Sequence, residues 1–145
     1  MVRNWIKVAQ SYLGTCETPG ALSTAKISEW LALIGLPEND EIAWCSAFLN
    51  GVMIECGIDG TGSGVARSWL KWGLECGPVP GAVGVLHRGN PKGWEGHVVI
   101  VIEDNGSEIT VIGGNQSDEV SVKRYPKSRV LGYRWPAGRL ELPKE

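Results

Sequence analysis

The residue best suited to covalent chemistry is Cys45, at the start of an apolar stretch with helical spacing. The apolar side chains recur on one helix face at Cys45, Phe48, Leu49, Val52, Met53 and Cys56. Acidic residues precede this stretch and Gly57 ends it, as is typical of helix termini. A helix N-terminus lowers the pKa of a thiol, and the thiolate is the nucleophilic form. Cys45 is therefore a candidate nucleophile, with burial in the core as the alternative.

A thiol nucleophile needs a base that accepts its proton and a third group that orients the base. Asn105-Gly106 is the strongest hairpin signal in the chain, and strand-like runs flank it. A two-residue loop there pairs His97 with Gly114, and a three-residue loop pairs it with Asn115. Because both registers place them side by side, we expect His97 to be the general base and Asn115 its orienting residue.

Each of these two residues has a structural alternative. A histidine at a strand end often bonds to a backbone carbonyl, and an asparagine after two glycines is a common turn residue. His87 is the only other histidine, and it is a weaker candidate because it adjoins the predicted loop Arg88-Gly89-Asn90.

The elements that must position these residues divide into a helical part and a β part. Helical spacing predicts helices over residues 2–14, 23–34, 45–56 and 66–72. Alternating or apolar runs predict strands over residues 83–87, 97–102, 108–112, 120–123 and 130–135. Helices followed by an antiparallel meander indicate an α+β fold, with the N-terminal helices packed on a C-terminal sheet of about five strands. We expect one catalytic domain over residues 1–145, helical to about 76 and β from about 82 to 136.

Composition excludes several classes of function. The net charge of −2 gives no general attraction to nucleic acid or to anionic membranes. No apolar run approaches the roughly 20 residues of a membrane span, so we expect no stable membrane insertion. The four cysteines form no C-x-x-C pair, so we expect reduced thiols and no metal. We also expect no other cofactor and a monomer. The first residues do not resemble a signal peptide, so we expect synthesis in a host cytoplasm.

Three short motifs in this order resemble a known group of enzymes. They are Trp44-Cys45-Ser46-Ala47-Phe48, then Gly96-His97-Val98 at the start of a strand, then Gly113-Gly114-Asn115-Gln116. The set is similar to the CHAP and NlpC-like cysteine peptidases, a papain-like group. Thr61-Gly62-Ser63 and Ala66-Arg67-Ser68-Trp69 increase the likeness to a small phage-associated branch. The similarity runs from about residue 40 to about residue 133.

The resemblance implies hydrolysis of peptidoglycan amide bonds by a Cys-His-polar triad without a metal. Position by position, Cys45 becomes the nucleophile, His97 the base and Asn115 the orienting residue. Many CHAP members have an acidic third residue or a calcium-binding acidic loop near the cysteine. Here the third position is asparagine, and Asn39-Asp40-Glu41 does not form a calcium-loop pattern.

Four further residues are candidates for oxyanion or substrate binding. Besides the Cys45 backbone N–H, Asn39 could supply an oxyanion donor, as an upstream amide does in papain-like enzymes, or it could cap the helix. Glu41 could face the cleft or lie in solvent. Trp44 and Trp94 adjoin the nucleophile and the base, so they could form the walls of a groove for a glycan or stem peptide, or pack in the core.

The leading hypothesis is a phage or prophage endolysin, either an endopeptidase or an N-acetylmuramoyl-L-alanine amidase, that reaches the periplasmic or cell-wall peptidoglycan after release. One alternative is an amidase effector or toxin with the same chemistry. Another is a non-catalytic wall-binding or virion structural module that retains the fold.

Overall fold

The computed structural model describes residues 4–16, 22–35, 44–116 and 119–137. The helices within these ranges are α1 (Trp5–Gln10), α2 (Leu22–Leu33) and α3 (Trp44–Glu55), with the 3₁₀ helices η1 (Ala66–Lys71) and η2 (Lys127–Arg129). The strands are β1 (Leu74–Glu75), β2 (Val83–His87), β3 (Gly96–Asp104), β4 (Glu108–Gln116), β5 (Glu119–Pro126) and β6 (Val130–Trp135). The α+β class expected from the sequence is confirmed.

The strands form one antiparallel sheet in the order β1-β6-β2-β3-β4-β5. The sheet has six described strands where about five were expected. The additional strand is β1, whose two residues pair with the end of β6. A two-residue strand has no alternating pattern, so its sequence carries no signal for it.

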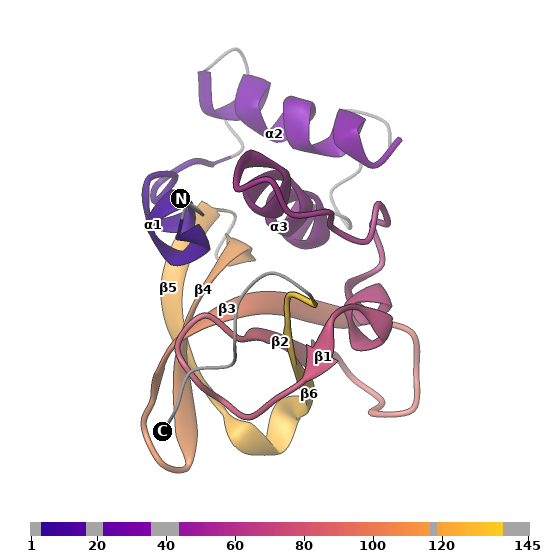
Figure 1. Ribbon diagram of the computed structural model, residues 1–145, viewed down its shortest axis with the longest axis vertical. Coiled ribbons are helices and arrows are strands. Elements are labelled where there is room, and N and C mark those ends of the chain that lie inside the picture. The colour runs from indigo at the N-terminus through magenta and orange to yellow at the C-terminus, as the bar shows by residue number, and fades with distance from the viewer. Residues whose placement is uncertain (1–3, 17–21, 36–43, 117–118, 138–145) are drawn as a thin grey trace.

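Helix α3 is the central element of the helical layer. It lies between α2 and the sheet, with α1 beside it (Figure 1). Every residue from Trp44 to Met53 is buried, including Asn50, which the single apolar stripe had placed off the buried face. Because α2 covers the side of α3 that faces away from the sheet, this helix is enclosed on both sides.

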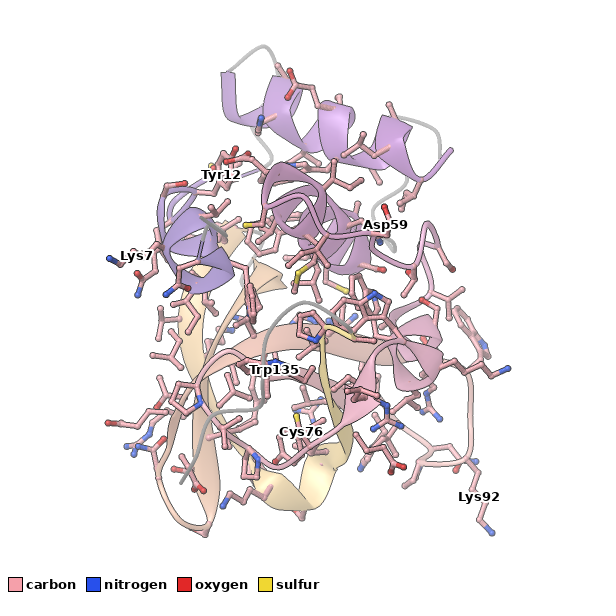
Figure 2. The ribbon with its side chains drawn as sticks, viewed as in Figure 1. Lys7, Tyr12, Asp59, Cys76, Lys92 and Trp135 are labelled. Carbon is pink, nitrogen blue, oxygen red and sulfur yellow. The ribbon has the colours of Figure 1, made fainter. Side chains whose placement is uncertain are left out.

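The two faces of the sheet contribute to two separate apolar clusters. Val98 and Ile100 of β3 pack with the helices, whereas Val99 and Val101 pack with the second cluster on the other face. This alternation follows from the two-residue period of a strand. Trp5 of α1 meets Trp135 of β6 edge to face, with ring centroids 5.3 Å apart, which ties α1 to β6. Trp135 is labelled in Figure 2.

None of the helices in the described ranges has the length and apolar character needed to cross a membrane.

Candidate active site

Cys45 lies in the first turn of α3, where the sequence placed it, and only 4% of its surface is exposed. Burial raises the pKa of the Cys45 thiol above its ordinary value. A hydrogen bond from the Val98 backbone N–H and the positive charge of Arg88 oppose that rise. The helix start was expected to lower this pKa, but desolvation outweighs it. The resting sulfur is therefore a neutral thiol that needs a base.

The contact with Val98 brings the sulfur to the start of β3, where His97 is the second residue of the strand. The imidazole is 1% exposed, and burial lowers the pKa of His97 to about 4. Its Nε2 atom lies 2.9 Å from Oε1 of Gln116. Its Nδ1 atom is buried and has no hydrogen-bond partner among the described residues.

Gln116 fixes the tautomer of this histidine through its own second hydrogen bond. The amide Nε2 donates to the backbone carbonyl of Ser121 at 2.6 Å, and a carbonyl oxygen can only accept. Gln116 must therefore present its Oε1 atom to His97, so that Nε2 of the imidazole carries the hydrogen. The lone pair is then on Nδ1, the buried nitrogen that has no described partner. Ser121, Gln116 and His97 thus prepare one ring nitrogen to accept a proton.

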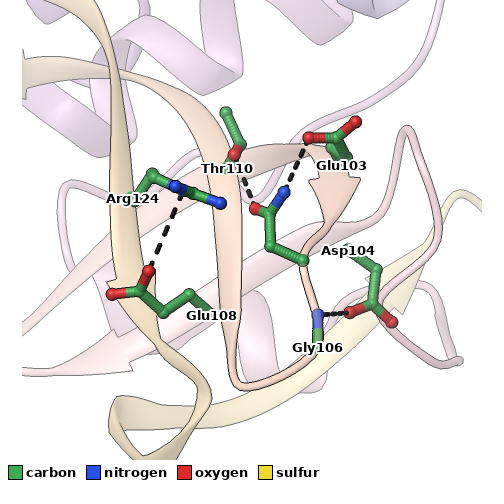
Figure 3. Close-up of polar contacts among 7 residues, drawn as sticks. Glu103, Asp104, Gly106, Glu108, Thr110 and Arg124 are labelled. Carbon is green, nitrogen blue, oxygen red and sulfur yellow. Dashed lines mark hydrogen bonds and ion pairs between the residues drawn. The ribbon is translucent and has the colours of Figure 1, made fainter.

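The hydrogen bond to His97 that was expected of Asn115 is made by Gln116 instead. The hairpin turn lies at the expected place, with Gly106 at φ 94° and held by Asp104 (Figure 3). Next to the turn Asp104 pairs with Ile109, a register that neither loop length predicts, whereas farther along Ile100 pairs with Ile112, as the three-residue loop predicts. An irregularity between Val101 and Glu103 shifts the pairing by one residue along β3.

A second irregularity in β4 decides which side chain meets the histidine. Gly113 pairs with Ser121 and Gln116 pairs with Glu119, so β4 contains one more residue than β5 between these pairs. Asn115 has φ 58°, the only positive value at a non-glycine residue in the described ranges. Such a bulge breaks the alternation of side chains. Gln116 therefore takes the face that an unbroken strand would give to Asn115.

The two tryptophans proposed as groove walls occupy different environments. Trp44 is fully buried at 0% exposure and stacks on Trp30, with ring centroids 6.4 Å apart. A Cβ atom at Gly114 would come within 3.0 Å of Trp44, so α3 and β4 are already in close contact here. Trp44 is thus a core residue and cannot line a groove, whereas Trp94 is 63% exposed. Asn39 and Glu41 lie outside the described residues.

The loop before β3 is held by Arg67, whose role the sequence did not indicate. The guanidinium donates to the carbonyls of Glu95 at 2.7 Å, Pro91 at 2.9 Å and Asn90 at 2.9 Å. Three hydrogen bonds from one planar group fix the loop that carries Trp94 and leads to His97. The aliphatic part of Arg67 also lies beside Gly96.

A second polar network joins α3 to the segment that follows it. Ser46 donates to the carbonyl of Ser63 at 2.6 Å and accepts from the indole of Trp69 at 2.9 Å. Asn50 accepts from the Gly62 backbone N–H at 2.9 Å. These contacts explain why polar residues lie inside the helical layer: they attach η1, and through Arg67 the Trp94 loop, to the helix that bears Cys45.

The arrangement contains a buried thiol, a neutral imidazole with one available lone pair and an amide that orients it. These are the parts needed for nucleophilic attack with general-base assistance. Within the described ranges, no three His, Cys, Asp or Glu side chains lie close enough together to hold a metal ion.

One comparison with known proteins identifies a family. The sequence model of the CHAP domain matches residues 37–115, more than half of the chain. The matched region includes Cys45 and His97 and ends one residue before Gln116. No curated protein matches the chain. The chain belongs to the CHAP domain family, in the superfamily of peptidoglycan amidases and endopeptidases.

Proposed function

We propose that the protein is a cysteine-dependent hydrolase of peptidoglycan amide bonds, with Cys45 as nucleophile, His97 as general base and Gln116 as the residue that orients the base. The observation that carries the proposal is the hydrogen-bonded series from Ser121 through Gln116 to His97. It leaves a buried Nδ1 lone pair beside the strand start that Cys45 contacts.

The chemistry starts from a neutral pair, because burial raises the pKa of the thiol and lowers that of the imidazole. Nδ1 of His97 takes the thiol proton as the sulfur attacks the carbonyl carbon of the scissile amide. The imidazolium then gives this proton to the departing amine, which leaves a thioester on Cys45. A water molecule, deprotonated by the same nitrogen, hydrolyses the thioester and restores the thiol.

Two groups support the transition state in this proposal. Oε1 of Gln116 accepts from Nε2 of His97 and stabilises the positive charge that the ring acquires. The Cys45 backbone N–H, at the start of α3, donates to the developing oxyanion.

Trp94 provides the surface for the wall polymer. Its indole is 63% exposed on the loop that Arg67 holds, close in sequence to His97. Aromatic faces of this kind pack on sugars and apolar side chains. Lys92, from the same loop, extends into solvent (Figure 2), so the loop is accessible to a large substrate.

The decisive experiment is digestion of purified sacculi, with the released fragments identified by mass spectrometry. The wild-type protein should release soluble fragments, and Cys45→Ala and His97→Ala should not, because each removes one reacting group. Cys76→Ala is the matched thiol control, since Cys76 lies beside the β1–β6 pair and apart from α3 (Figure 2). Digestion by Cys45→Ala at the wild-type rate would refute the proposal. The fragments also identify the bond and separate an endopeptidase from an amidase.

The biological setting that we propose is that of a phage or prophage endolysin that reaches the wall after release from the cell. Its support is the resemblance to a phage-associated branch in Thr61-Gly62-Ser63 and Ala66-Arg67-Ser68-Trp69. A neighbouring holin gene would favour this setting, and a neighbouring immunity gene would favour an effector. If a thiol reagent labels Cys45 no faster than the other cysteines, a non-catalytic module is favoured.

A further inference from the structure

A tyrosine and a cation continue from the catalytic histidine on the side away from the helices. The ring of Tyr125 lies 5.9 Å from that of His97 at an interplanar angle of 60°. The guanidinium of Arg129 lies over the Tyr125 ring, 5.1 Å from its centroid. Arg129 also donates to the carbonyl of His87 at 3.1 Å, so its position is fixed. The Tyr125 ring therefore contacts both the imidazole of His97 and the fixed guanidinium of Arg129.

Two more cations act on His97, one from β5 and one from the residue after β2. Lys123 lies two residues before Tyr125 on β5, on the same side of the strand as Tyr125 and Ser121. Arg88 is exposed and follows His87, whose strand partner Gly96 precedes His97. Positive charge from Arg88, Arg129 and Lys123 opposes protonation of the imidazole and lowers the pKa of His97. The charge of Arg88 also opposes the rise in the pKa of Cys45 and of Tyr125 that burial causes.

This positive charge is not balanced by the described part of the protein. The described ion pairs use other cations, namely Lys26 with Glu29, Arg124 with Glu108 and Lys127 with Asp104. No described carboxylate pairs with Arg88, Lys123 or Arg129. Cations that approach a general base make its conjugate acid less stable, and an anion bound among them would offset this effect.

We propose that Arg88, Lys123 and Arg129 form a cationic subsite that binds a carboxylate on the peptide part of the substrate, beside the bond that Cys45 attacks. The inference rests on the proposed function and adds the chemical class of the substrate that the site selects. Peptidoglycan stem peptides carry carboxylates close to their amide bonds. Arginine side chains match the planar geometry of a carboxylate, and lysine adds a charge.

The test measures binding and does not depend on turnover. Cys45→Ala protein is titrated by calorimetry with a synthetic stem peptide that has free carboxylates, and with the same peptide amidated at those carboxylates. The free-acid peptide should bind about tenfold more tightly, the effect of one charge-assisted contact that the amide loses. Adding Arg88→Gln or Lys123→Gln to the Cys45→Ala protein should reduce this ratio of the two affinities several-fold. Neither substitution should weaken the binding of the amidated peptide by much.

Arg124→Gln is the matched control for Lys123→Gln. Arg124 is the next residue on β5, points to the other side of the strand and pairs with Glu108. It should leave the ratio unchanged. Arg129→Lys retains the charge without the planar group and should keep most of the ratio, which separates the loss of charge from a loss of packing on Tyr125.

The outcomes distinguish this inference from the proposed function. If the wild-type protein digests sacculi but Cys45→Ala binds both peptides equally, the cationic subsite is refuted and the hydrolase remains. If Arg124→Gln lowers the ratio as much as Lys123→Gln does, the effect is a general one of net charge, and the subsite is also refuted. A failure to digest sacculi refutes the proposed function, and the binding ratio still decides whether the site selects a carboxylate.

Discussion

Replacement of Gln116 by alanine tests the central feature of the site. The change removes the acceptor for Nε2 of His97, which is buried, and the donor for the Ser121 carbonyl, which is part-buried. A buried group left without a partner costs about 1–3 kcal/mol and a part-buried one costs less, so we expect a loss of roughly 2–4 kcal/mol in the free energy of unfolding. The cost in activity is a separate quantity.

Without Gln116 the imidazole can carry its hydrogen on Nδ1, which removes the lone pair that the proposed mechanism uses. It can also rotate, and small misplacements of a catalytic group cost up to about a hundredfold in rate. We therefore expect kcat/KM for peptide cleavage to fall by about ten- to a hundredfold in Gln116→Ala. Urea unfolding of the same samples shows that the measured protein is folded.

Asn115→Gly is the matched comparison. Asn115 has φ 58°, a conformation that glycine adopts without strain, so the bulge should persist. Activity should remain within a few-fold of the wild-type value. The reverse order, with Asn115→Gly strongly impaired and Gln116→Ala at the wild-type rate, would refute the assignment of the orienting role. It would restore the expectation drawn from the sequence.

Four further predictions concern the pKa of His97, the pH dependence of stability, the Trp94 loop and the reactive thiol. Gln116→Glu should raise the pKa of His97 and move the acidic limb of the pH–rate profile upward, while destabilising the fold because a carboxylate cannot donate to Ser121. Since the pKa of His97 is lowered to about 4 from an ordinary 6.5, the unfolded chain binds the extra proton between these values. Stability should therefore fall by roughly 2–3 kcal/mol from pH 7 to pH 4.5 in urea titrations, and less in His97→Phe. Arg67→Ala should raise KM for sacculi more than it lowers kcat, because the loop that carries Trp94 loses three hydrogen bonds. If Trp94→Ala and the double variant Arg67→Ala/Trp94→Ala lose equal activity, the result supports an action of Arg67 through Trp94. EDTA should leave digestion unchanged and a thiol alkylator should stop it; restoration by added zinc or calcium would indicate a metal site.

Local sequence determined most of the elements and two of the catalytic candidates. Cys45 lies at the start of a helical apolar pattern and His97 at the start of an apolar run. Both patterns are contained in one short stretch of the sequence. The α+β class follows in the same way, from helical spacing before residue 76 and strand spacing after it. The hairpin at Asn105-Gly106 was also located correctly, because its turn chemistry is local.

Only the tertiary structure decided which side chain meets His97. Each one-residue irregularity in a strand reverses the faces of all residues beyond it, and β3 and β4 contain one each. The bulge around Asn115 depends on its pairing with β5 and on the close contact between Gly114 and α3, neither of which leaves a local pattern. The same holds for the raised pKa of Cys45, because desolvation comes from the whole fold and outweighs the local effect of the helix start. The joint effect of Arg88, Lys123 and Arg129 on the pKa of His97 likewise needs the folded sheet, because Arg88 follows β2 whereas Lys123 and Arg129 lie on β5 and the 3₁₀ helix after it.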